Sequence, residues 1–98
     1  MRVGVVVEFS IKDGQKDAFV RNIEELIALT QKEEGCITFD LYEADDESGN
    51  LVMLETWANR EALDMHTKSE HFLRIFPTLE VYQTAPPNIR FFNMLQKN

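Results

Sequence analysis

An alternation of side chains near the start of the chain restricts the fold more than any other feature. Over residues 2–10, Val3, Val5, Val7 and Phe9 share one parity, whereas Gly4, Glu8 and Ser10 place smaller or polar groups on the other. A period of two that is rich in β-branched residues predicts a β-strand with one apolar face. We expect this segment to be the first strand of a sheet.

A long amphipathic helix is predicted over residues 14–34, because apolar residues recur there at helical spacing. Asp13 is suited to cap its first turn and Gly35 to end it. The outer face carries charged residues that we interpret as solvated and without a special role: Lys16, Arg21, Glu24, Glu25, Lys32 and Glu33.

The rest of the chain is predicted to form a hairpin, two short helices with a turn, and a final strand. Two β-like runs, 36–44 and 51–58, enclose a loop of turn-forming residues and predict a hairpin. Asn59 and Ser69 are suited to cap two short helices, the second ending at Pro77, and a turn over 79–82 follows. Residues 89–95 read as a final strand.

This order of elements predicts the fold class α+β. It corresponds to the split βαβ, ferredoxin-like arrangement, an antiparallel sheet with helices on one face. The run 51–58 carries apolar residues on both parities, including Met53 on one and Leu54 on the other. Helices cover only one face, so we expect a homodimer that uses the other face, in a dimeric α/β barrel-type assembly.

Length and composition narrow the class of protein. With 98 residues, 44% of them hydrophobic, residues 1–98 are expected to form a single domain with its own core. A net charge of -7 disfavours nucleic acid as a partner, and no apolar run approaches a membrane span. The single cysteine, Cys36, makes no internal disulfide, so we expect a cytoplasmic protein.

The two histidines, His66 and His71, are candidates for acid–base chemistry because they titrate near neutral pH. Leu63 and His66 lie three residues apart, which turns His66 toward the interior of a helix-covered sheet. A structural role for either histidine remains the alternative.

Several strand residues are further candidates. Trp57 is suited either to wall a pocket for a flat organic ligand or to fill the core. Glu55 and Asp40 interrupt apolar strands, and a carboxylate that faces a core requires a hydrogen-bond partner or a raised pKa. Both are therefore site candidates unless they face solvent.

The spacing of acidic, glycine and cysteine residues in the sequence does not match common metal or nucleotide sites. An EF-hand loop that starts at Asp45 would require glycine and glutamate where the chain has Asn50 and Thr56. The sequence contains no glycine-rich phosphate loop, nucleophile elbow or paired cysteines. We therefore expect no metal, flavin or haem to be required.

Several segments together resemble the antibiotic biosynthesis monooxygenase family of small dimeric α+β proteins. They are residues 34–42 (EGCITFDLY), 54–57 (LETW), 61–63 (EAL) with His66, and 69–72 (SEHF). The resemblance implies a cofactor-independent monooxygenase that oxidises a small quinol or polycyclic aromatic with dioxygen. Trp57 matches the pocket tryptophan of the monooxygenase branch, and His66 matches a helix histidine found in several branches.

The resulting hypothesis assigns a role to each candidate. His66 would act as a base, oriented by a carboxylate such as Glu55 or Asp40. Trp57 and Phe72 would hold the substrate ring in an apolar pocket, and His71 is placed among the substrate-binding residues.

Two alternatives remain. The tail 90–95 is similar to that of a family member that isomerises a phosphorylated autoinducer-2 breakdown product, although Leu26-Ile27 stand where that branch has Asn-His. The haem-degrading branch uses an asparagine on the first strand, and residues 8–10 contain none. A binding module of the same fold without catalytic turnover is the other alternative.

Overall fold

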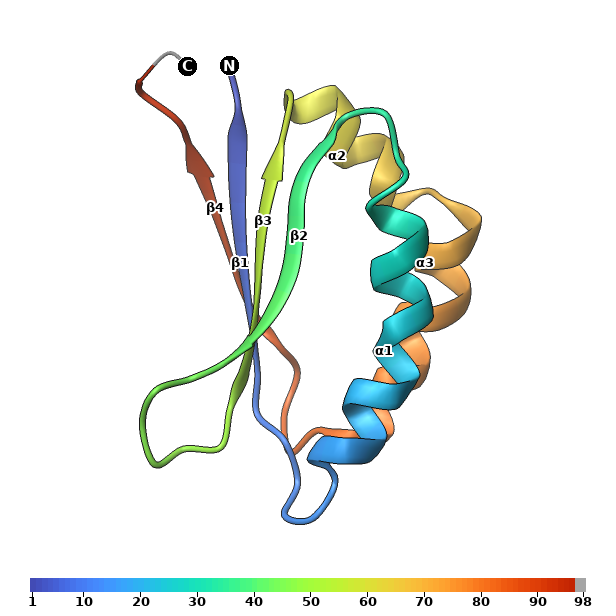
Figure 1. Ribbon diagram of the computed structural model, residues 1–98, viewed down its shortest axis with the longest axis vertical. Helices are drawn as coiled ribbons and strands as arrows, with labels where there is room; N and C mark the ends of the chain where they lie inside the picture. The colour runs from blue at the N-terminus through green and yellow to red at the C-terminus, as the bar shows by residue number, and fades with distance from the viewer. Residues whose placement is uncertain (97–98) are drawn as a thin grey trace.

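A computed structural model describes residues 1–96 as one antiparallel sheet covered by helices on one side (Figure 1). The strands are β1 (Val3–Phe9), β2 (Cys36–Glu43), β3 (Leu51–Trp57) and β4 (Asn88–Asn93), and they lie in the order β2-β3-β1-β4. All three neighbouring pairs are antiparallel. The predicted α+β, ferredoxin-like fold is confirmed.

Three α-helices and a 3-10 helix form the second layer. They are α1 (Lys16–Thr30), α2 (Arg60–Thr67), α3 (Glu70–Ile75) and η1 (Phe76–Tyr82), and Figure 1 shows them on the same side of the sheet. The predicted caps of the two short helices are confirmed, because the Asn59 side chain accepts from the Ala62 N–H and the Ser69 side chain from the Phe72 N–H. No helix within residues 1–96 is both long and apolar enough to cross a membrane.

The first helix is shorter than the sequence predicts. It begins at Lys16 after an uncapped Gln15, so the expectation that Asp13 caps it is wrong. Gly14, with a φ of 79°, turns the chain between Asp13 and the helix. The helix ends at Thr30, and two tight turns then lead through Glu33 into β2. Residues 31–34 therefore lie outside the helix that we predicted for them.

Other boundaries differ by less. The last strand occupies Asn88–Asn93 instead of residues 89–95. The turn expected over residues 79–82 is the end of η1, which begins at Phe76 and has proline in its first turn.

The core lies between the sheet and the helices. Val3, Val5, Val7 and Phe9 are buried on β1, as their shared parity predicts. Their partners on β3 are the alternate residues Leu51, Met53, Glu55 and Trp57, and all four are buried. The helices contribute residues such as Phe19, Ile23, Leu26, Leu63 and Leu79 to the same cluster.

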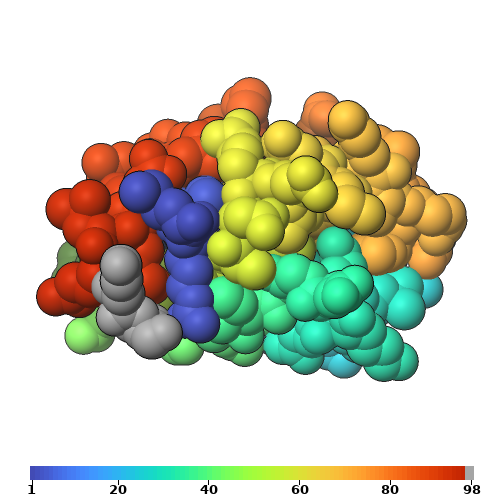
Figure 2. All heavy atoms as spheres, turned by 90° about the horizontal axis from the view of Figure 1, so that it is seen from above, coloured from blue at the N-terminus to red at the C-terminus, as the bar shows by residue number. Residues whose placement is uncertain are grey.

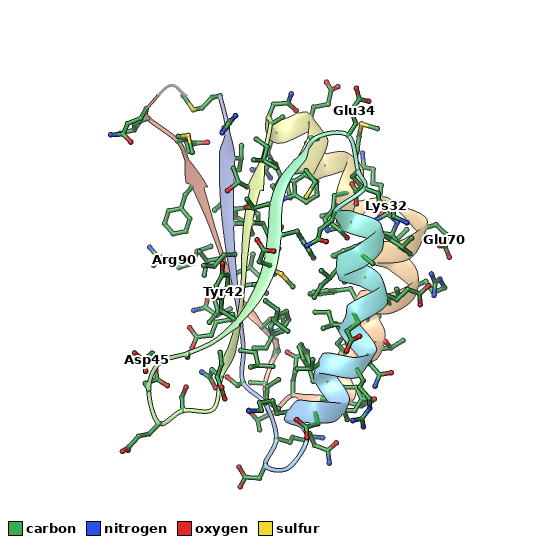
Figure 3. The ribbon with its side chains drawn as sticks, in the orientation of Figure 1. Lys32, Glu34, Tyr42, Asp45, Glu70 and Arg90 are labelled. Carbon is green, nitrogen blue, oxygen red and sulfur yellow. The ribbon has the colours of Figure 1, made fainter. Side chains whose placement is uncertain are left out.

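The opposite face of the sheet has no helix over it. Leu54, Tyr42 and Phe92 belong to this face by register, and 40%, 53% and 42% of each is exposed, respectively. Figure 3 shows Tyr42 and Arg90 on the side of the sheet away from the helices. Apolar side chains of this face thus stay partly uncovered in the single chain.

Close packing of Gly35 against α2 is testable. A Cβ atom at position 35 would overlap the Cβ of Ala62, whereas one at Gly4 meets nothing nearer than 3.7 Å. We expect Gly35→Ala to lower the free energy of unfolding by about 1–3 kcal/mol, the usual cost of overpacking. Chemical denaturation measures this, with Gly4→Ala as the matched control. Equal stability of the two variants would contradict the packing described.

Candidate functional site

His66 occupies the centre of the candidate site. The Asn59 cap sets the start of α2, so that Leu63 and His66 both face the sheet and are buried. The His66 ring packs against three aromatic rings, with centroid distances of 4.7 Å to Trp57, 5.4 Å to Phe39 and 5.0 Å to Phe72. The inward orientation expected from the helical spacing is confirmed, with His66 only 2% exposed.

A carboxylate holds one edge of this ring. Nδ1 of His66 lies 2.7 Å from Oε2 of Glu33, and Nε2 of His71 lies 2.6 Å from the same oxygen. A carboxylate oxygen only accepts hydrogen bonds, so both ring nitrogens must donate. This pattern assigns a proton to Nδ1 of His66 and leaves its Nε2 with a lone pair when the ring is neutral.

The local electrostatics favour the neutral ring of His66. Burial lowers the pKa of His66, and the hydrogen bond and charge of Glu33 offset only part of that effect. The positive charge that His71 carries when protonated lowers it further. Within residues 1–96, Nε2 of His66 has no hydrogen-bond partner. Nε2 of the neutral His66 ring, which carries the lone pair, is therefore available to a ligand.

The involvement of Glu33 corrects the sequence interpretation. The sequence pattern predicts Glu33 on a solvated helix face and a carboxylate such as Glu55 or Asp40 as the partner that orients His66. Because α1 ends at Thr30, Glu33 lies in the turn before β2. The backbone hydrogen bond from Ala58 N to Gly35 O, 2.8 Å long, joins that turn to the segment leading into α2. Glu33 and His66 are far apart in sequence, so no local pattern reveals this contact.

Glu55 forms a separate buried pair with Trp57. Nε1 of Trp57 donates to Oε1 of Glu55 at 2.9 Å, and the two residues are 0% and 9% exposed, respectively. Burial raises the pKa of Glu55 to about 7, with a smaller contribution from the negative charge of Glu33 and an opposing one from the Trp57 hydrogen bond. A carboxyl with this pKa exists in both protonation states near neutral pH.

A small cavity separates the sheet from the helices at this site. Its volume is about 80 Å³, and its lining is mainly apolar, with Glu55 and His66 as the ionisable groups. Phe72, Ile89 and Phe91 also line it, and the last two belong to β4 and are 43% and 53% exposed. Ligand pockets usually reach ~300 Å³ or more, so an aromatic ligand requires these side chains to move apart.

The remaining candidates lie outside the cavity. Trp57 is fully buried and does not line the cavity. Its ring packs against His66 and its Nε1 donates to Glu55, so it positions two residues that do line the cavity. His71 borders an open hollow on the other side of Glu33, where the 31–36 turn, α2 and α3 meet at one end of the molecule (Figure 2). Asp40 is exposed on β2, and its carboxylate contacts Gln31 instead of His66.

A family model supplies the decisive comparison. Residues 2–78 match the model described as "Antibiotic biosynthesis monooxygenase". The chain belongs to the antibiotic biosynthesis monooxygenase family. The matched range contains every residue of the candidate site except Ile89 and Phe91 of the cavity lining.

Individual relatives agree with this assignment. Rv0793 of Mycobacterium tuberculosis, named as a candidate monooxygenase, is 37% identical over 71 residues, which cover 72% of this chain and 69% of that protein. An uncharacterised Synechocystis protein, sll1783, is 25% identical over 92 residues, and the match covers 94% of this chain but only 63% of the relative.

Solved structures show the same architecture. A conserved protein from Methanosarcina mazei superposes with a TM-score of 0.90 at 33% identity, covering 94% of this chain and 91% of its own. The Rv0793 structure gives a TM-score of 0.90 at 30% identity, covering 99% and 98%. The family and the fold expected from the sequence are therefore confirmed.

The buried carboxyl of Glu55 predicts a pH-dependent stability. Between pH 4.5, the ordinary pKa, and about 7, the folded chain keeps a proton that the unfolded chain has released. Raising the pH through this interval therefore lowers the free energy of unfolding, by about 3 kcal/mol in total. Glu55→Gln keeps an acceptor for Trp57 and should lose this part of the pH dependence. Chemical denaturation at several pH values measures it, and identical pH profiles for both proteins would contradict the assignment.

Proposed function

We propose that this protein is a cofactor-independent monooxygenase that oxidises a small quinol or polycyclic aromatic with dioxygen. The supporting observation is the position of His66, which borders an apolar cavity while Glu33 holds its Nδ1. The neutral ring then has its lone pair on Nε2, the atom that accepts a proton from a substrate. Membership of the family and the monooxygenase names of two relatives support the reaction class.

The chemistry needs only a proton acceptor and a dry site. Removal of a phenolic or activated C–H proton by Nε2 of His66 makes the substrate anion electron-rich enough to reduce dioxygen itself. One oxygen atom then enters the substrate, and the other leaves as water. For a methylene carbon between two aromatic rings, CH2 and O2 become C=O and H2O, and the electrons come from the substrate alone. The apolar lining limits water during these steps.

Glu55 supplies a second ionisable group in the same cavity. Its protonated form is a hydrogen-bond donor, suited to the oxygen of a bound substrate or to the peroxide formed from it. Trp57 occupies one oxygen of this carboxyl and thereby orients it. We therefore assign His66 as the base, Glu55 as a donor to substrate oxygen, and Glu33 and Trp57 as positioning residues.

A phosphorylated substrate fits the cavity less well. The residues that line it include no lysine or arginine, whereas phosphate groups are generally bound by cationic side chains or helix N-termini. This favours oxygenation of an aromatic over isomerisation of a phosphorylated dicarbonyl compound. A binding module without turnover is excluded only by an activity measurement.

Oxygen uptake with a panel of reduced quinols and anthrones tests the proposal. We expect wild-type protein to consume dioxygen with at least one of them. His66→Gln should slow uptake by roughly a hundredfold or more, as loss of a general base does. Asp40→Asn is the matched control and should leave the rate unchanged, since Asp40 lies outside the site. Full activity in His66→Gln would remove His66 from the role of base.

We also propose a cytoplasmic homodimer formed through the uncovered face of the sheet. Its apolar residues Leu54 and Phe92 remain about two-fifths exposed in the single chain, which is costly for an isolated subunit. Pairing two such faces would close the sheets into the barrel-type assembly expected from the sequence.

Light scattering distinguishes the mass of the proposed dimer from that of a single chain. Wild-type protein should have twice the chain mass at micromolar concentration, and Leu54→Glu should shift it toward the monomer by placing a charge in the interface. Leu73→Glu, on α3 and 60% exposed, is the matched control and should remain dimeric. A monomeric wild-type protein would refute the interface.

A further inference from the structure

Three metal-ligating atoms converge beside the cavity. Nδ1 of His66, Nε2 of His71 and an oxygen of Glu33 all lie within 4.8 Å of one another. The two nitrogens approach the same carboxylate oxygen, at 2.7 and 2.6 Å. Of these three residues only His66 lines the cavity, so the cluster adjoins the space assigned to the substrate while His71 and Glu33 lie outside it.

The donor set suits a borderline transition metal. Two imidazoles and one carboxylate are the three protein ligands of many zinc sites, in which water supplies the fourth. Imidazole nitrogen favours Zn²⁺, Co²⁺ or Ni²⁺ over Mg²⁺ and Ca²⁺, which prefer oxygen ligands. Two nitrogens bound to one zinc lie ~3.4 Å apart, so small side-chain rotations and a withdrawal of the Glu33 oxygen suffice to admit the ion.

An access route leads to the cluster from solvent. His71 and Glu33 border an open hollow of about 700 Å³, together with Gly35, Ala62 and Ser69. The side chains of both are partly exposed, at 17% and 18%, whereas that of His66 is only 3% exposed. An ion that enters from the hollow would therefore meet His71 and Glu33 first and reach His66 at its Nδ1 edge.

We propose that Glu33, His66 and His71 form an inhibitory site for a divalent transition-metal ion of the zinc type. Without the ion, Glu33 holds the proton of neutral His66 on Nδ1. A metal bound at Nδ1 displaces that proton to Nε2, because a neutral imidazole carries one proton on its two nitrogens. Nε2 then becomes a donor, and His66 no longer accepts a proton from the substrate. The proton stays on the ring, so the exchange is balanced.

Metal binding is testable without any activity. Protein freed of metal with a chelator is titrated with Co²⁺ and with Zn²⁺ by calorimetry, and we expect one ion per chain. Bound Co²⁺ should show visible absorption typical of nitrogen and oxygen ligands. It should also quench Trp57, the one tryptophan of the chain, because its ring lies 4.7 Å from that of His66. Mg²⁺ should do neither.

Variants locate the ion. His71→Gln and Glu33→Gln should each weaken binding at least tenfold, because loss of even a group that only supports a metal ligand costs roughly that much. Glu34→Gln is the matched control, because Glu34 borders the same hollow but is exposed and is absent from the cluster. Figure 3 shows Glu34 at the end of the molecule where the turn before β2 lies. Unchanged affinity in both cluster variants, or no stoichiometric binding by the wild-type protein, would overturn the site.

The inhibitory role rests on the proposed function and has its own test. One equivalent of Zn²⁺ should suppress oxygen uptake by the wild-type protein, and a chelator should restore it. Stoichiometric Zn²⁺ binding with undiminished uptake would overturn the inhibition but leave the site. If no substrate is oxidised at all, the proposed function fails. Long-range ¹H–¹⁵N NMR still tests the site, since Zn²⁺ should move the His66 proton from Nδ1 to Nε2.

Discussion

The hydrogen bond between Glu33 and Nδ1 of His66 is the interaction on which the site depends. It fixes the tautomer of a buried histidine and so determines which nitrogen is free to act. The aromatic rings of Trp57, Phe39 and Phe72 restrict the ring from the other directions. The same carboxylate oxygen also contacts His71, which is partly exposed to solvent. The buried His66 is thus linked through Glu33 to a histidine that solvent reaches.

The fold makes this contact possible by bringing three distant segments together. The early end of α1 leaves Glu33 in a turn, the β2–β3 pairing sets that turn beside Ala58, and the Asn59 cap starts α2 one residue later. Gly35 allows the turn to approach Ala62 closely. The helices cover one face of the sheet and enclose the cavity, while the other face remains available for association.

Local sequence patterns predict most of the fold and part of the site. Alternation on β1, the two side-chain caps and the inward turn of His66 follow from periodicity and capping chemistry, and the structure has all of them. Glu55 likewise stands out as a carboxylate in an apolar strand, and it is buried. These features depend on neighbours a few residues away, which is the range that a single sequence reveals.

The errors involve contacts between distant segments. Glu33 precedes β2 and Asp40 lies within it. Only tertiary packing determines that Glu33 contacts His66 and that Asp40 is exposed. The sequence allows Trp57 as either a pocket wall or a core residue. Its burial against His66 depends on the strand register and on the position of α2, which the sequence does not specify. Likewise, the helix boundary at Thr30 depends on turns that propensity does not specify.

The protonation state of His66 tests the proposed role of Glu33 most directly. A long-range ¹H–¹⁵N NMR spectrum of metal-free protein near pH 7 distinguishes the two neutral tautomers and the imidazolium by the chemical shifts of the ring nitrogens. We expect a protonated Nδ1 and an unprotonated Nε2, and loss of this preference in Glu33→Ala, which removes the acceptor for Nδ1. A neutral ring protonated at Nε2, or an imidazolium at this pH, would contradict the assignment of the His66 proton to Nδ1.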